Sequence, residues 1–487
     1  MNKDLKSNTS AEVDASLRLP LLALFGGAAL WLVLGSVLAM IGSIKFHAPD
    51  FLANYAWLTY GRVQPAADDA LLYGFCIPAG LGVLLWLIAH LGQVPMRGVI
   101  VPLFAANLWH LGVFIGLAAV LLGDSTGFAW LEFPRGGSVV LFIAYLLLAL
   151  WAMMNFAARR ERALYPSHWF LVAALFWFPW IYSTSNLFLV AWPVRGVVQA
   201  VIGWWFADNL LFVWLALVGL GAAFYFLPKF SGRPLQTYYL ALFAFWTLIL
   251  FGTWCGIPPG APVPAWLPAT GSFAAALTIV PVLTIGVIMV QTLRGGEKCG
   301  GLGGPFCFVC FGTGAFLLSS LMFLAMAWPR FAVVTQFTWF DPAQVQLQLY
   351  GFFAMTMFGA IYYLLPRVVG FAWPFPKLAR LQFWLSTVGV LLLVVPLAIG
   401  GVVQGMKLNN PNIAFLEAAK AALFYFRFST TGLLLILLGN LLFALNIFGL
   451  TFVWKLSLLK QALALIKAPL ETGSASISLR RDKEVKA

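Results

Sequence analysis

Residues 337–370 read FTWFDPAQVQLQLYGFFAMTMFGAIYYLLPRVVG, and this stretch decides the fold. It contains an apolar run of about 25 residues, which is long enough for one membrane-spanning helix. Asp341-Pro342 is typical of a helix start, because proline tolerates the first turn. Pro366-Arg367 is typical of a helix end, where a proline interrupts the helix and a cation suits the carboxyl end. We therefore predict a transmembrane helix over 342–366.

The composition extends this interpretation to the whole chain. Of its 487 residues, 62% are hydrophobic and only 9% are charged, which is typical of a protein that crosses a membrane many times. The net charge of +13 does not indicate nucleic-acid binding, because an excess of Lys and Arg over acids is usual in the cytoplasmic loops of membrane proteins. The expected surrounding partner is the lipid bilayer.

Hydrophobic runs predict an all-α integral membrane protein with about twelve transmembrane helices. We expect a cytoplasmic tail over 1–18, a membrane domain over 19–457 and a basic cytoplasmic tail over 458–487, with a surface segment at 412–427. The expected spans are 19–44, 70–93, 98–122, 138–158, 167–192, 203–228, 236–255, 270–293, 306–328, 342–366, 380–404 and 429–457.

The basic residues predict the orientation. Most of the 29 Lys and Arg residues fall in the two tails and in alternate loops. Since cytoplasmic loops are enriched in these residues, both termini are expected in the cytoplasm.

Two motifs carry a resemblance to a known family. One is FGAIYYL at 358–364, followed by Pro366 and Arg367, and the other is LTYGR at 58–62, followed by Pro65. The chain resembles subunit I of the cbb-type cytochrome c oxidases, in the heme–copper oxidase superfamily; the nitric oxide reductase large subunit is more distant. The resemblance implies a bacterial inner-membrane location, heme b, a high-spin heme, copper, and c-type cytochrome subunits as partners.

The resemblance also assigns ligand positions, and none of them holds a histidine. The heme-ligand positions match Ala67, Gln344 and Gln346, and the copper-ligand positions match Ala207, Pro258 and Pro259. The family's cross-linked tyrosine matches Gly252, and its proton-feeding glutamate matches Met322. Heme iron and copper need neutral imidazole here, so we expect neither cofactor. Bulky residues such as Trp204, Trp205 and Trp254, or lipid, are expected to fill the space.

Other metal-ligating residues are few. The chain has four histidines, which we interpret as interfacial or packed side chains, leaving open a His90–His168 pair at the inner face. Cys299, Cys307 and Cys310 could form a zinc or redox site, but a fourth ligand is lacking nearby, so buried cysteines are the favoured interpretation.

Three acids near the expected outer side are candidates for a polar cavity. Asp208 adjoins a copper-ligand position, and Asp68 and Asp69 adjoin Ala67. Charges inside a membrane often mark pathways or partners. The alternative is that these acids lie in the first turns of their helices, where carboxylates are favoured.

Three functions remain open on this basis. The first is a cofactor-free, non-catalytic scaffold in a respiratory or electron-transfer complex, bound to other membrane subunits. The second is a catalytic oxidase or nitric oxide reductase with unrecognised ligands. The third is a transporter for ions or small molecules that uses the vacated cavity. The sequence does not decide whether lipid, quinone or ions occupy that space.

Overall fold

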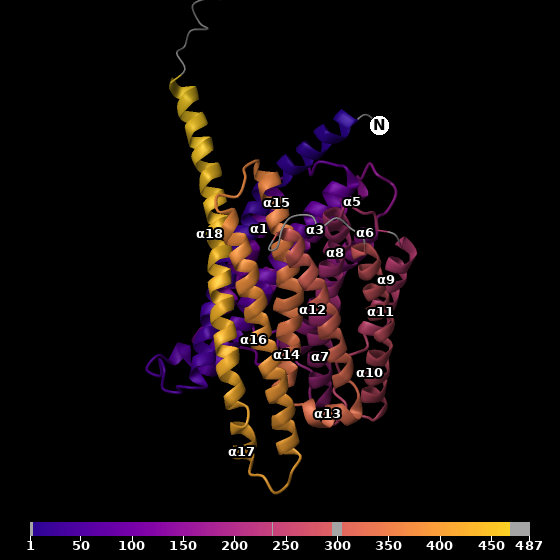
Figure 1. Cartoon of the computed structure of the whole chain (residues 1–487), viewed down its shortest axis with the longest axis vertical. Helices are drawn as coiled ribbons and strands as arrows, with labels where there is room; N and C mark the ends of the chain where they lie inside the picture. The colour runs from indigo at the N-terminus through magenta and orange to yellow at the C-terminus, as the bar shows by residue number, and fades with distance from the viewer. Residues whose placement is uncertain (1–2, 236, 295–303, 468–487) are drawn as a thin grey trace, which may run out of the picture.

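The computed structural model describes residues 3–235, 237–294 and 304–467, and these residues form a bundle of helices without a strand (Figure 1). The first half contains α1 (Lys3–Lys45), η1 (Ala56–Leu58), α2 (Tyr60–Asp69), η2 (Ala70–Cys76), α3 (Ile77–Gly92), α4 (Ile100–Leu122), α5 (Arg135–Ala157), α6 (Pro166–Ser185), η3 (Asn186–Ala191), α7 (Val197–Asp208), η4 (Asn209–Trp214) and α8 (Leu215–Ser231). The second half contains α9 (Tyr238–Gly252), α10 (Trp266–Leu277), α11 (Ile279–Leu293), α12 (Pro305–Met326), α13 (Pro329–Thr335), α14 (Phe340–Gln346), η5 (Leu347–Ala354), α15 (Met355–Val369), α16 (Pro376–Leu408), α17 (Phe415–Lys420) and α18 (Leu423–Lys467).

The prediction of an all-α membrane fold is confirmed. Among the described residues, 11 helical stretches are long and apolar enough to cross a membrane. The expected span at 236–255 corresponds to α9, a shorter apolar helix of 15 residues that packs against α11. The described chain begins and ends at the same end of the bundle (Figure 1). An even number of crossings requires this, and the number is even when α9 is counted with the other 11.

Three continuous helices form the centre of the bundle. The most apolar windows of 60–92, 197–231 and 340–369 are 94%, 89% and 83% buried, against 50% or less in the other spans. Because neighbouring helices cover most of each of these three windows, the three helices occupy the interior of the bundle. The third contains most of the stretch 337–370. This helix continues three residues past Pro366 to Val369 and is capped by Gly370, whose φ is 82°.

The structure differs from the expected tails. Helix α1 begins at Lys3, so most of residues 1–18 extend the first helix, and Val13 and Leu17 are buried. At the other end, α18 continues to Lys467, and the remainder of the tail lies outside the described residues. The sequence missed the first extension because its charges looked solvated, whereas Asp14 has a buried partner.

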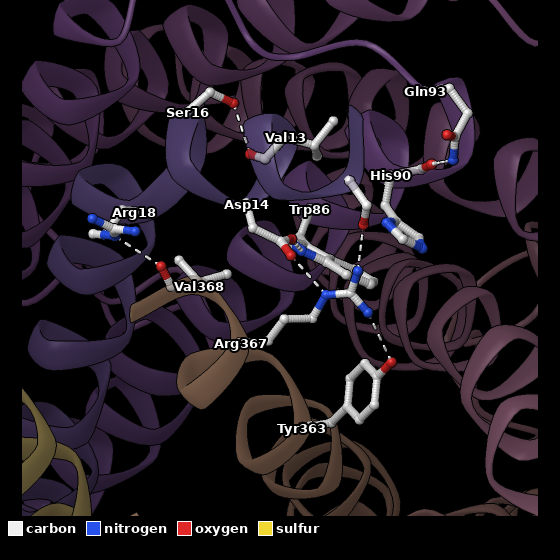
Figure 2. A network of polar contacts seen from close by, with 11 residues as sticks. Val13, Asp14, Ser16, Arg18, Trp86, His90, Gln93, Tyr363, Arg367 and Val368 are labelled. Carbon is white, nitrogen blue, oxygen red and sulfur yellow. Dashed lines mark hydrogen bonds and ion pairs between the residues drawn. The ribbon is translucent and has the colours of Figure 1, made fainter. Parts of the chain in front are cut away.

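Figure 2 shows that partner network. The Arg367 Nε donates to Asp14 Oδ2 at 2.6 Å, and the Trp86 indole donates to Asp14 Oδ1 at 2.8 Å. The same guanidinium also donates to Tyr363 and Ser10. These contacts join the start of α1 to α3 and α15 at one end of the bundle.

Candidate functional site

The polar residues of the three central helices share one local feature. Each helix contains a π-helical segment, and Asp69, Asp208 and Gln346 are the residues immediately before η2, η4 and η5. A π-turn adds a residue to the helix without adding a turn, and such turns are frequent at functional sites. The three segments therefore mark where each central helix presents a polar side chain.

A smaller cavity, of about 110 Å³, lies between the first and third central helices. Its lining includes Ala67, Asp68 and Gln346, with residues of α1, α16 and α18. Two of the expected heme-ligand positions thus face one space. The Gln64 amide donates to Asp68 Oδ2 at 3.0 Å, and the Gln346 amide donates to Asp68 Oδ1 at 3.4 Å. Asp68 is therefore satisfied by two amides from different helices.

A larger cavity, of about 310 Å³, lies between the second and third central helices. Ala207, Pro258, Pro259 and Gln344 all line it, which brings together the other four expected ligand positions. Asp68 and Asp208 thus line separate cavities, and the prediction of one shared polar cavity is wrong.

Asp208 is the most unusual residue of the larger cavity. It is 7% exposed, and neither carboxylate oxygen has a hydrogen-bond partner among the described residues. The alternative that Asp208 opens its helix is wrong, because the helix begins at Val197. Asp68 and Asp69 are likewise not in a first turn, since their helix begins at Tyr60.

Asp69 lines neither cavity. Its carboxyl group lies near that of Glu132, in the loop between α4 and α5. Both Asp69 oxygens lack a hydrogen-bond partner among the described residues. Sequence reasoning missed Glu132. Its only signal was a single acid in the apolar run WLEFP at 130–134.

This pair predicts a pH-dependent stability. Burial raises the pKa of Glu132 from 4.5 to about 7. The folded chain then keeps a proton that the unfolded chain releases, so the free energy of unfolding should decrease as pH rises from about 4.5 to about 7, by order of 1–3 kcal/mol. Thermal unfolding at pH 5 and pH 8 measures this difference.

The matched variants are Glu132→Gln and, at an exposed loop position, Glu161→Gln. We expect the first to flatten the pH dependence and the second to leave it unchanged. An unchanged dependence in Glu132→Gln would mean that another group causes it.

The two remaining assigned positions are surrounded by apolar side chains. Gly252 ends α9 against Val213 and Phe212 of η4, and Met322 packs on the apolar core from α12. The tryptophans expected to fill the space do so only in part. Trp204 lines the larger cavity, Trp205 stacks edge-on against Trp180, and Trp254 is 63% exposed.

Each histidine contacts its own neighbours. His47 bonds Thr430, His90 stacks on Trp86, His110 accepts from the Trp31 indole, and His168 accepts from the Tyr165 backbone amide. Cys307 and Cys310 lie in the first turns of α12, and Cys299 is outside the described residues. Among the described residues, no group of three or more His, Cys, Asp or Glu could hold a metal ion.

The donor set of the two cavities does not fit the cofactors that the resemblance implies. A heme–copper centre needs imidazole nitrogens facing one another at one level. The described lining residues of both cavities include carboxylates, amides and hydroxyls, and none of them is a histidine or cysteine. At the six assigned positions, alanine and proline have no ligating atom and glutamine is a neutral amide.

Comparisons with known proteins agree with the fold. A family model described as "Cytochrome C and Quinol oxidase polypeptide I" matches residues 20–435. The chain is 22% identical to a cbb3-type cytochrome c oxidase subunit CcoN1 from Stutzerimonas stutzeri, over 80% of this chain and 86% of that one. It is 23% identical to a cytochrome c oxidase subunit 1 from Rhodobacter capsulatus, over 86% of this chain and 82% of that one.

A solved structure is also similar. A heme–copper terminal oxidase dimer determined by cryo-EM superposes with a TM-score of 0.71 at 14% identity, over 89% of this chain and 84% of that one. With the family match over most of the chain, this establishes that the protein belongs to the heme–copper oxidase subunit I family, that of cytochrome c and quinol oxidase polypeptide I.

Proposed function

We propose that the chain is a non-catalytic member of this family: a cofactor-free membrane scaffold that binds partner subunits in a respiratory or electron-transfer complex. One observation carries the proposal. Six positions that would supply ligands converge on two cavities at the centre of the bundle, and they supply Ala, Pro and Gln instead of imidazole. A single substitution could be compensated by a neighbour, but six around the same two cavities leave no ligand set.

The partners would bind the outer, lipid-facing surface of the bundle. Family members are subunits of larger oxidase complexes, and a chain that keeps the fold can keep such lateral contacts without a metal. We therefore propose other membrane subunits as partners, with c-type cytochromes the first to test. We also place the protein in a bacterial inner membrane with both termini in the cytoplasm, as its basic loops favour.

The test is the absorption spectrum and metal content of the chain purified in mild detergent. We expect no heme and no copper at a stoichiometric level. Partner subunits are then sought by mass spectrometry of the same preparation. A sharp heme b band at one heme per chain would overturn the proposal and support the catalytic alternative. A chain isolated repeatedly alone, with normal respiratory complexes in a deletion strain, would overturn the scaffold role.

A further inference from the structure

We propose that the larger cavity binds a small organic cation of the alkylammonium class, whose charge pairs with Asp208 and whose alkyl groups lie against aromatic side chains. The inference rests on the proposed function, because a heme in the same place would occupy this space.

The carboxylate of Asp208 favours a positively charged ligand. Asp208 is buried with both oxygens unpartnered, and the described residues that line the cavity include no Lys, Arg or His. A buried carboxylate without a partner is costly, so it either takes up a proton or pairs with a cation. Gly256 holds this side chain in place, since a Cβ at Gly256 would lie 2.5 Å from the Asp208 Cβ.

The neighbouring amides do not neutralise that carboxylate. The Gln344 side-chain amide donates to the Ser319 carbonyl at 3.4 Å, and the Gln348 amide donates to the Leu211 carbonyl at 3.3 Å. The Gln348 carbonyl oxygen in turn accepts from the Ser319 hydroxyl. The contrast with Asp68 in the smaller cavity is direct, because there two glutamine amides point at the acid.

The lining of the cavity is rich in aromatic side chains. Trp130, Trp204, Phe212, Phe323 and Phe337 line the cavity. Aromatic faces attract cations, and tryptophan does so most strongly. Trp130 and Phe337 also have φ values of 67° and 59°, a left-handed backbone that side chains other than glycine rarely adopt and that tends to occur at functional sites.

These features favour an organic cation over a metal ion. Calcium or magnesium needs about six oxygen ligands, whereas Asp208 is the single buried carboxylate among the described lining residues. The volume of about 310 Å³ is instead in the range of small-molecule sites. At the rim, Phe337 is 88% exposed and Asp341 is also exposed, so the cavity is reached past an aromatic ring and a carboxylate.

The test is isothermal titration calorimetry of the full-length purified chain with choline, tetramethylammonium and tetraethylammonium. The matched control ligand is 3,3-dimethylbutan-1-ol, which has the shape of choline without its charge. We expect saturable binding of at least one cation, and binding of the neutral alcohol that is weaker than choline by about tenfold or more. Equal binding of choline and the alcohol would overturn the proposal.

Two variants separate the contribution of the Asp208 charge to binding from that of the aromatic lining. Asp208→Asn should weaken cation binding by about tenfold or more, and Trp204→Leu should weaken it less. Asp208→Asn should fold normally, since Asp208 makes no hydrogen bond to another described residue. Asp50→Asn and Trp192→Leu, at exposed positions outside the cavity, are controls that should leave affinity unchanged.

Four other results would contradict the inference. Binding that is insensitive to both cavity variants would place the ligand elsewhere. No binding of any of the three cations by folded, heme-free protein would leave Asp208 protonated and the proposed function intact. Saturable binding of sodium or potassium alone would replace the organic cation with a metal ion. A heme found in the same preparation would overturn the proposed function itself.

Discussion

Replacing Arg367 with leucine is expected to destabilise the protein by about 3 kcal/mol, because it leaves the buried carboxylate of Asp14 without its cation. The side chain of Asp14 is only 8% exposed, and without Arg367 it would keep the Trp86 indole as its one donor in the network of Figure 2. The start of α1 should then separate from α3 and α15. Thermal unfolding in detergent measures the loss.

A matched control is available in the same chain. Lys407 and Glu417 form an ion pair at 3.8 Å, with side chains 35% and 66% exposed. Lys407→Leu should cost less than about 1 kcal/mol, since exposed pairs contribute little. Asp14→Asn combined with Arg367→Leu should recover part of the stability lost in Arg367→Leu alone. Equal losses from Arg367→Leu and Lys407→Leu would show that the network in Figure 2 adds nothing.

Replacing Gly405 with alanine is expected to cost about 3 kcal/mol or more, because the added methyl group would meet backbone that cannot rotate away. A Cβ at Gly405 would lie 1.7 Å from the Val334 carbonyl oxygen, and one at Gly401 would lie 2.2 Å from the Phe340 nitrogen. Helix α16 therefore lies directly against the segment that leads into α14. Thermal unfolding measures the loss, and the amount of folded protein after size-exclusion chromatography provides a second reading.

The control for this prediction is Gly314→Ala. A Cβ at Gly314, on an exposed face of α12, meets no other atom within 4 Å. Alanine should therefore be neutral there, or stabilising by up to about 1 kcal/mol through its higher helix propensity. If Gly405→Ala were as stable as Gly314→Ala, the close approach of α16 would be incorrect.

Much of this fold could be predicted from the sequence, because apolar run length and membrane thickness constrain each other. Eleven expected spans have counterparts that are long enough to cross, although the expected 203–228 begins six residues earlier, at Val197. That difference matters for the site. Polar residues such as Asp68 and Asp208 suggested helix starts, whereas the central helices bury them well inside because neighbouring helices exclude water.

The site was predicted less completely. Family motifs indicated which positions should face one another, and Gln344 and Gln346 do face different cavities. The sequence could not show that Asp208 has no partner or that Gln346 satisfies Asp68, because both facts depend on side-chain directions across three helices. It also missed the contact of Glu132 with Asp69, which joins a loop to a helix more than sixty positions earlier.

The π-helical segments have a consequence for the direction of these side chains. Each residue of an α-helix turns the chain by about 100°, so one extra residue within η4 sets the angular offset between α7 and α8. Shortening η4 by one residue would restore ordinary α-helical periodicity. With α8 held by its neighbours, Asp208 would swing by about 100° around the helix axis, away from the larger cavity. Each of the three segments thus sets the direction of one polar side chain relative to the helix that follows it.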